Sequence, residues 1–155
     1  MKINFGIIGA GLIGRKRALT LPKGVHLEVI CDIDRIKGQQ FATEFNCEYE
    51  EDWKEVIKRK NIDAVIICVT NNLLAKIAIS AINEKKHVLI EKPGGISVDD
   101  FKKTLRAHKK NPGVVMYGYN HRLHPAIQKA KELVISKKYG KVLFIRGKYG
   151  HGGRL

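Results

Sequence analysis

The stretch Gly9-Ala10-Gly11-Leu12-Ile13-Gly14 decides the fold of this chain. It follows a short apolar run at residues 3–8, which is typical of a strand buried on both faces. It opens a segment at residues 12–21 that is expected to be helical and to stop at Pro22. Glycines at this spacing permit a tight turn, a close approach of the backbone to a bound group, and close packing of helix on strand. The chain is therefore expected to begin with a strand, a tight turn and a helix.

Strand-like and helical segments alternate along the rest of the chain. Further strands are expected at residues 25–31, 64–69, 87–90, 114–117 and 141–147. Helices are expected at residues 35–45, 52–60, around 74–82, after Ser97 as N-cap, and at 125–136. This alternation indicates βαβ units with right-handed crossovers. The expected fold class is α/β, a doubly wound parallel sheet of the Rossmann type.

Length, charge and cysteine content limit the classes of protein to which this chain can belong. The 155 residues provide one core, and 29 Lys and Arg against 15 Asp and Glu give a net charge of +14. The basic residues are scattered near predicted helix ends, where they complement helix dipoles, so a solvated basic surface is favoured over a nucleic-acid interface. Cys31, Cys47 and Cys68 form no C-x-x-C pair, which argues against a disulfide framework and a structural metal site. No apolar run approaches the roughly 20 residues of a membrane span, and no signal-peptide pattern is present, so a cytoplasmic location without a membrane partner is expected.

An acidic residue follows the second expected strand at the distance that a dinucleotide site requires. Asp32 comes about 20 residues after the glycines, where a carboxylate can accept both adenosine ribose hydroxyls and repel a 2′-phosphate. NAD is therefore favoured over NADP. Asp34 is the competing candidate, but it suits the N-cap of the next helix better. Arg35 keeps the use of NADP open, because a guanidinium there can pair with a 2′-phosphate.

The segment Glu91-Lys92-Pro93 ends the fourth long strand and precedes two glycines. On its own it has a simple alternative explanation, a surface ion pair before a proline turn. However, the order of motifs resembles the glucose-fructose oxidoreductase and inositol dehydrogenase family (Gfo/Idh/MocA). That order comprises the glycine motif, Asp32, a Thr-Asn turn at residues 70–72, Glu-Lys-Pro, and Tyr-Asn-His-Arg at residues 119–122. The resemblance implies hydride transfer between a nicotinamide cofactor and a carbinol of a sugar, cyclitol or sugar nucleotide.

The resemblance also implies roles for individual residues. Lys92 corresponds to the catalytic lysine, which can stabilise a developing alkoxide and take part in proton transfer, and which also contacts cofactor and substrate. Glu91 is expected near the nicotinamide, holding Lys92 in place, and Arg122 is expected to bind an oxygen-rich substrate. The expected cofactor-binding residues are Gly9, Gly11, Leu12, Ile13, Gly14, Asp32, Ile33, Thr70, Asn71, Asn72, Glu91, Lys92 and Asn120. His121 and His124 are interpreted as structural, because two histidines at this spacing do not make a metal site.

The sequence departs from the family pattern in two places. The family commonly has Thr-Pro-Asn and then a histidine after the third strand, whereas this chain has Thr70-Asn71-Asn72 and Ala75. The turn there is expected to differ. Residues 1–120 are expected to form the dinucleotide-binding domain, and residues 121–155 a linker helix and the first strand of a substrate domain. A full-length form is expected to be a homo-oligomer, while this chain alone is expected to be inactive.

Two other classes of protein fit parts of the sequence. A non-catalytic NAD-sensing module would keep the glycines and Asp32 but would not need Lys92. A basic nucleic-acid-binding domain would account for the net charge of +14. Titration with NADH, and with a DNA duplex at two salt concentrations, separates dinucleotide binding from nucleic-acid binding.

Overall fold

The computed structural model describes residues 3–148 and 150. The chain divides into two compact units, Met1–Tyr119 and Asn120–Leu155, and each is described by itself. The strands of the first unit are β1 (Ile3–Ile8), β2 (Val25–Cys31), β3 (Glu48–Glu50), β4 (Ala64–Ile67), β5 (His87–Ile90) and β6 (Val115–Tyr117). Its helices are α1 (Leu12–Leu19), α2 (Arg35–Phe45), α3 (Trp53–Lys58), α4 (Asn71–Asn83) and α5 (Val98–Lys110).

The strands form one parallel sheet in the order β3-β2-β1-β4-β5-β6. This is the order of a doubly wound Rossmann sheet, so the expected fold class is confirmed. The order reverses between β1 and β4, which are hydrogen-bonded neighbours at the middle of the sheet. Ligands of open parallel sheets bind at such a reversal, outside the carboxyl ends of the strands.

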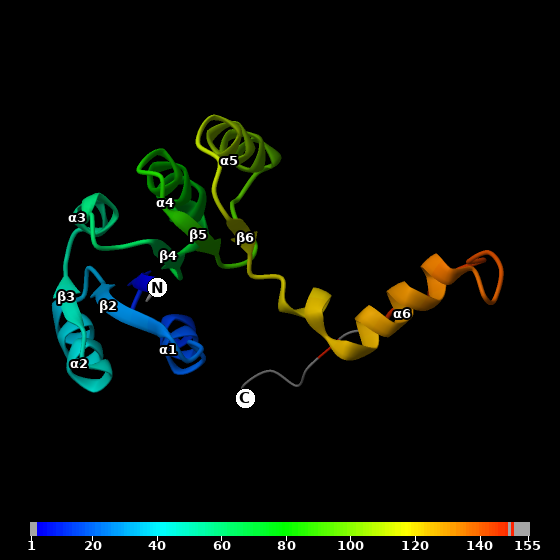
Figure 1. Ribbon diagram of the computed structural model, residues 1–155, viewed down its shortest axis with the longest axis horizontal. Coiled ribbons are helices and arrows are strands. Elements are labelled where there is room, and N and C mark those ends of the chain that lie inside the picture. The colour runs from blue at the N-terminus through cyan, green and yellow to red at the C-terminus, as the bar shows by residue number, and fades with distance from the viewer. Residues whose placement is uncertain (1–2, 149, 151–155) are drawn as a thin grey trace. The chain divides into compact units, whose positions relative to one another are not determined.

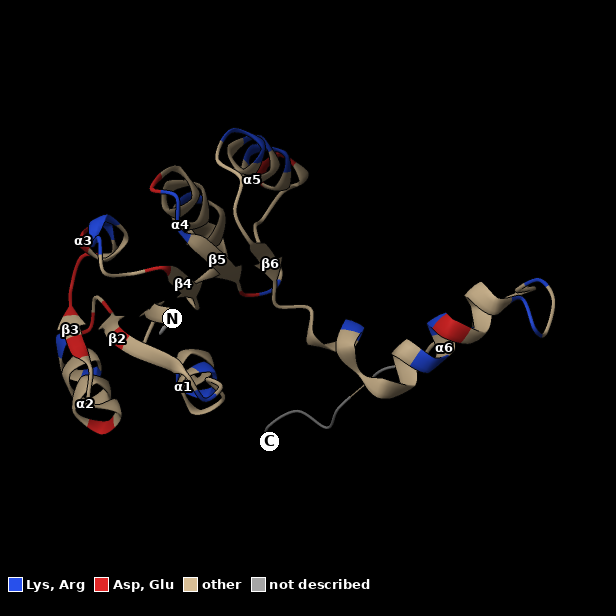
Figure 2. Cartoon of the chain, in the orientation of Figure 1, with Lys and Arg blue, Asp and Glu red and all other residues tan. Residues whose placement is uncertain are grey.

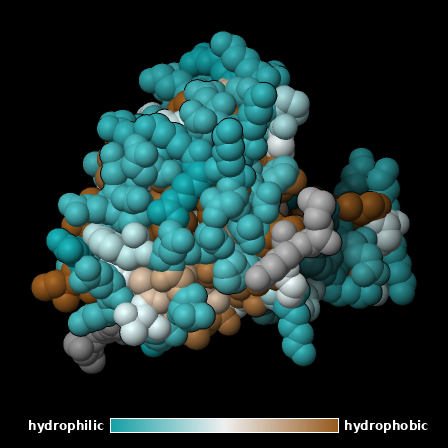
Figure 3. Space-filling model, turned by 60° about the vertical axis from the view of Figure 1, so that its left-hand side comes forward, coloured by the Kyte–Doolittle hydropathy of each residue, from teal (hydrophilic) through white to brown (hydrophobic). Residues whose placement is uncertain are grey.

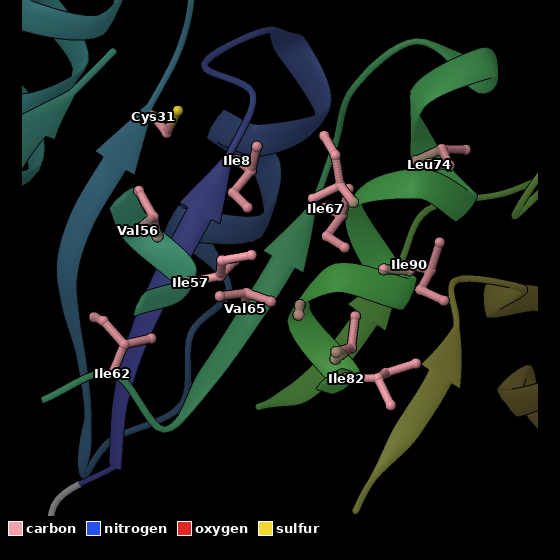
Figure 4. Packing of buried hydrophobic residues seen from close by; sticks show 14 of the residues in the cluster. Ile8, Cys31, Val56, Ile57, Ile62, Val65, Ile67, Leu74, Ile82 and Ile90 are labelled. Carbon is pink, nitrogen blue, oxygen red and sulfur yellow. The ribbon is translucent and has the colours of Figure 1, made fainter. Parts of the chain in front are cut away.

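Helices cover both faces of the sheet, as Figure 1 shows. On one face, α3, α4 and α5 bury apolar side chains such as Val56, Leu74 and Ile82 against Val65 and Ile67 of β4 (Figure 4). On the other face, Phe41 and Ala42 of α2 pack on β1, β2 and β4. Because both faces are covered, β4 is buried along its whole length, which explains its uninterrupted apolar sequence.

The structure confirms most of the expected elements and corrects their ends. The strands at residues 3–8, 25–31 and 87–90 and the helix at 35–45 have the expected bounds. The first helix ends two residues early, at Leu19, and β4 ends at Ile67. The edge strand β3 was not expected, because its sequence Glu48-Tyr49-Glu50 is short and acidic. It forms because its backbone pairs with the exposed edge of β2.

The second unit contains the 3-10 helix η1 (Asn120–Leu123) and α6 (Pro125–Ser136). The helix α6 has the expected bounds, with proline in its first turn. The strand expected at residues 141–147 is wrong, because the described residues there have no regular structure. A strand needs a hydrogen-bonded neighbour, and residues 120–148 contain no other strand to provide one. Residues 151–155 of this expected domain lie outside the described residues.

The surface carries the excess of basic residues, and Figure 2 shows them on several helices rather than in one place. Basic side chains occupy the last turns of α1, α3 and α5, as expected for residues that complement helix dipoles. The face drawn in Figure 3 is mostly hydrophilic and is interrupted by apolar patches. Among the described residues, no helix has the length and apolar character needed to cross a membrane.

Candidate functional site at the carboxyl edge of the sheet

The glycine motif forms the loop between β1 and α1, and two of its glycines are required by the fold itself. Gly9 has a φ of +109°, and a Cβ atom there would lie 2.3 Å from the carbonyl oxygen of Cys68. A Cβ atom at Gly14 would lie 1.9 Å from the carbonyl oxygen of Gly9. The first glycine thus makes the turn and the third packs α1 against the loop.

Gly11 is different, because nothing in the protein requires a glycine there. A Cβ atom at Gly11 would have no neighbour within 4 Å among the described atoms, and its φ of −73° is open to any residue. The missing side chain therefore leaves space on the outside of the loop. This is the space that a bound pyrophosphate occupies when the second glycine of such a motif allows it to approach the backbone.

The beginnings of the helices fall into two groups. In α2, α3 and α5, the side chains of Asp34, Asp52 and Ser97 accept backbone N–H groups of the first turn. In α1 and α4, which follow the two central strands, no side chain of the described residues caps the first turn, and no acidic residue lies in it. The Thr70 carbonyl oxygen accepts the N–H of Leu73 in the first turn of α4. The other N–H groups of these two first turns are left for water or an anion.

Asp32 is held against the glycine loop. Its Oδ2 accepts the N–H of Ala10 at 2.7 Å, and its Oδ1 accepts the N–H of Asp34 at 2.9 Å. A carboxylate has about four acceptor positions, so two remain for the hydroxyls of a ribose. Asp34 has the expected capping role, because its Oδ1 accepts the N–H of Lys37 at 3.2 Å. The Lys37 ammonium group lies 2.8 Å from Asp34 Oδ2, and its hydrogen bond, together with that of the Lys37 backbone N–H, lowers the pKa of the Asp34 carboxyl.

A tyrosine on β3 supports the backbone that carries Asp32. The Tyr49 hydroxyl donates to the carbonyl oxygen of Asp32 at 3.0 Å. The ring of Tyr49 lies against α2 at Gly38, where a Cβ atom would be 2.1 Å from the ring carbon Cε2. Sequence reasoning did not single out either residue, since β3 itself was not expected.

Apolar side chains surround this edge without being buried. Leu12 is 54% exposed, Ile13 39% and Ile33 86%. A large exposed isoleucine directly after Asp32 is available to pack on a flat ring that lies beside the ribose. These apolar side chains lie close in sequence to the glycine loop and to the Asp32 carboxylate, which suit the polar parts of a dinucleotide. The edge therefore offers both polar and apolar groups to a ligand.

The turn after β4 forms without the family's proline. Thr70 has extended backbone angles, φ −63° and ψ 149°, and its carbonyl oxygen accepts the N–H of Leu73 at 2.9 Å. The helix α4 starts at Asn71, and the side chains of Thr70, Asn71 and Asn72 are exposed. The turn therefore keeps its polar groups at the carboxyl edge of the sheet. It directly follows β4, one of the two strands between which the strand order reverses.

Glu91 is almost completely buried, with 7% of its surface exposed, at the end of β5. Its Oε1 accepts the Nε–H of Arg17 on α1 at 2.6 Å, and the Arg17 Nη2 group contacts the same oxygen. Its Oε2 accepts the backbone N–H of Lys92 at 3.2 Å. The expectation that Glu91 holds Lys92 is met through the Lys92 backbone, while the charged partner of Glu91 is Arg17. The sequence signal for Arg17 is weak, because it is one of three consecutive basic residues on α1.

Lys92 follows Glu91 and is exposed. Its ammonium group makes no hydrogen bond or ion pair with another described residue. The peptide bond between Lys92 and Pro93 is cis. The carbonyl oxygen of Pro93 accepts the Tyr119 hydroxyl at 2.8 Å. The amine is thus presented to solvent from a backbone that is fixed on both sides.

Asn120 and Arg122 belong to the second unit, which is described by itself. Both lie in η1, and the Arg122 carbonyl oxygen accepts the side-chain amide of Gln128. His124 caps α6, with its Nδ1 accepting the N–H of Ala126 at 3.2 Å. The structural interpretation of His124 is therefore confirmed.

Comparison with known proteins identifies the family. Residues 3–119 match the oxidoreductase family Gfo/Idh/MocA, described by its NAD-binding Rossmann fold. The chain belongs to this family. It is 28% identical to inositol 2-dehydrogenase of Salmonella paratyphi B over 96% of its own length and 46% of the relative. It is 30% identical to levoglucosan dehydrogenase of Pseudarthrobacter phenanthrenivorans over 95% of the chain and 40% of the relative.

A solved structure supports the same assignment. Scyllo-inositol dehydrogenase from Lactobacillus casei, with bound NAD(H) and scyllo-inositol, superposes with a TM-score of 0.83. The two sequences are 26% identical, and the match covers 90% of this chain and 43% of that chain. The chain therefore spans less than half the length of the relatives it matches.

Proposed function

We propose that this chain binds a nicotinamide dinucleotide across the carboxyl ends of β1, β2, β4 and β5. The observation that carries the proposal is the pair of uncapped helix starts, α1 and α4, on either side of the reversal in the sheet. An anion at the α1 start would accept N–H groups that the protein leaves unused, in the space beside Gly11. The residues present fit this group.

The remaining parts of the dinucleotide have candidate partners on the same edge. The free acceptor positions of Asp32 suit the two hydroxyls of the adenosine ribose and oppose a 2′-phosphate, so we propose NAD as the preferred cofactor. Leu12, Ile13 and Ile33 offer apolar surface to the bases. Thr70, Asn71, Asn72, Glu91, Lys92 and Asn120 complete the proposed cofactor-binding set.

The whole protein is proposed to oxidise or reduce a CH–OH group of a sugar, a cyclitol or a sugar nucleotide. Bound NAD supplies the acceptor for the hydride that leaves the carbinol carbon. Lys92 then has two tasks: its amine takes the hydroxyl proton, and the resulting ammonium stabilises the charge on the oxygen. Arg122 is proposed to bind the oxygen-rich substrate. The inositol and levoglucosan dehydrogenases to which the chain is similar support this substrate class.

We propose a cytoplasmic location and a homo-oligomeric state for the full-length protein. Cys31, Cys47 and Cys68 are free thiols, which fits the reducing conditions of the cytoplasm. In the second unit, Leu143, Phe144 and Ile145 are each more than 80% exposed. Apolar side chains in a row need a covering surface, which we propose is provided by the rest of the substrate domain and by a second copy in a homo-oligomer of the full-length protein.

Calorimetric titrations with NADH, NADPH and ADP-ribose test the binding proposal. We expect saturable binding of NADH and ADP-ribose and weaker binding of NADPH, because Asp32 repels the 2′-phosphate. A DNA duplex at two salt concentrations is the matched control, and any association with it should disappear at the higher salt concentration. Salt-resistant duplex binding without NADH binding would contradict the proposal and favour a nucleic-acid-binding domain.

A further inference from the structure

The ion pair between Arg17 and Glu91 joins two segments that are 74 residues apart in the sequence. Arg17 lies on α1, the helix that the glycine loop opens, and Glu91 lies at the end of β5 directly before Lys92. The side chains are 20% and 9% exposed, so the pair is largely withdrawn from water. Salt screens such a pair much less than it screens a surface pair.

Other groups enclose the pair. A Cβ atom at Gly118, after β6, would lie 3.1 Å from both the Arg17 Nη2 atom and the Glu91 Oε2 atom. The Cys68 thiol is close enough to be influenced by the charges of both residues. Burial raises the pKa of the Cys68 thiol to about 12, with the charge of Glu91 acting in the same direction and Arg17 opposing it. The guanidinium contact to Oε1 and the close approach of Gly118 thus limit where the Glu91 carboxylate can lie.

The pair acts on Lys92 through the second oxygen of Glu91. Arg17 contacts Oε1 and leaves Oε2 to accept the backbone N–H of Lys92. The contacts thus run from α1 through the guanidinium and the carboxylate to the Lys92 backbone. They connect the loop that would hold a pyrophosphate to the turn that carries the proposed catalytic amine.

We infer that Arg17 is a positioning residue, which fixes the Glu91-Lys92 turn relative to the glycine loop and so sets where the nicotinamide end of the cofactor lies. This inference rests on the proposed dinucleotide site. The other arginine with a side-chain partner on α1, Arg15, pairs with Glu44 at the surface and is 51% exposed. Arg15 therefore provides a matched control on the same helix.

The test uses Arg17→Met, Arg17→Lys and the control Arg15→Met. In Arg17→Met, hydrogen exchange followed by mass spectrometry should show faster exchange in peptides covering residues 91–96. We expect about a tenfold increase, since hydrogen bonds to charged groups of this kind are lost. Peptides of β1 should stay unchanged, and Arg17→Lys should lie between wild type and Arg17→Met. Arg15→Met should leave residues 91–96 as in the wild type.

The second readout compares two ligands that differ only at the nicotinamide end. Arg17→Met should weaken NADH binding about tenfold while ADP-ribose binding stays within about twofold, a difference of roughly 1 kcal/mol or more. Equal losses for both ligands, or unchanged exchange at residues 91–96, would overturn the inference. If the wild type binds neither ligand, the proposed function fails. The exchange experiment still tests whether Arg17 fixes the Glu91-Lys92 turn. If Arg17→Met does not fold, Arg17→Lys carries both readouts.

Discussion

The helices α1 and α5 both follow strands of the same parallel sheet, yet they begin in opposite ways. In α5, Ser97 accepts the N–H of Asp100, and Asp100 accepts the N–H of Ser97, both at 3.2 Å. In α1, the N-cap is Gly11, which has no side chain to offer. The side chains at the start of α5 satisfy N–H groups of that helix. At the start of α1, no described side chain does so.

The difference indicates which helix starts serve stability and which serve binding. A capped start contributes about 1 kcal/mol to the free energy of unfolding. An uncapped start gives up that contribution, and a bound anion can replace it. Substitutions at the capped and uncapped starts should therefore separate into two classes, one that changes stability and one that changes cofactor affinity.

Lys92→Ala should have the largest effect on the activity of the protein with its substrate domain present. We expect kcat to fall about 10²- to 10⁴-fold, because a proton-transfer group of the transition state is lost. The affinity for NAD should stay within a few-fold of wild type, since the amine is proposed to act on the reacting oxygen. Steady-state kinetics and a cofactor titration measure the two quantities. Equal losses in both would mean that Lys92 acts mainly by binding the cofactor and does not act on the reacting oxygen.

Gly14→Ala should have the largest effect on stability. The added Cβ atom would lie 1.9 Å from the Gly9 carbonyl oxygen, so the backbone has to move. We expect the free energy of unfolding to fall by about 2–3 kcal/mol, as for other overpacked sites. Urea unfolding followed by circular dichroism measures it, and an unchanged midpoint would mean that α1 can shift without cost.

Asp32→Ala should weaken NAD binding and narrow its advantage over NADP. Two hydrogen bonds to the ribose are lost together with the charge that opposes a 2′-phosphate, and the loss should be about 10- to 100-fold for NAD. Asp34→Ala is the control, because Asp34 caps α2 and should change stability only. Calorimetry with NADH and NADPH gives both affinities. An unchanged NADH to NADPH ratio in Asp32→Ala would reduce Asp32 to a support for the loop.

Gly11→Ala tests the uncapped start directly. Its Cβ atom has no described atom within 4 Å, so the free energy of unfolding should change by less than about 1 kcal/mol. The same Cβ atom stands where a pyrophosphate would approach the backbone, and NADH affinity should fall about tenfold. Paired calorimetry and urea unfolding separate the two effects. Full retention of NADH affinity would show that the cofactor does not use this loop.

Ser97→Ala should have the smallest effect, and one on stability alone. Loss of the cap of α5 should lower the free energy of unfolding by about 1 kcal/mol. Thr70→Ala is the matched control, because the Thr70 side chain makes no capping hydrogen bond and its loss should cost less. NADH affinity should be unchanged in Ser97→Ala, and a decrease there would erase the distinction between the two helix starts.

Sequence reasoning succeeded where the signal was local. Apolar runs predicted β1, β2 and β5 with their bounds, and the caps at Asp34 and Ser97 followed from residue type and position. The positions of the glycines and Asp32 also followed, because the motif has a fixed spacing. These features depend on a few neighbouring residues.

Three features depended on contacts between distant segments and could not be predicted. The strand β3 exists because β2 offers it an edge, although its own residues are mostly acidic. Residues 141–147 have an apolar pattern, but the described part of the second unit contains no strand with which they could pair. The Arg17–Glu91 pair joins residues 74 positions apart, and nothing near Arg17 distinguishes it from its basic neighbours.

The contact between Gly38 and Tyr49 has a consequence for protein engineering. Any side chain at position 38 would collide with the Tyr49 ring, and displacing that ring removes the hydroxyl that supports Asp32. Positions 38 and 49 are therefore epistatic, so substitutions at the two sites will not add. A library that aims to switch cofactor preference by varying residues 32–36 should keep both positions constant or randomise them as a pair.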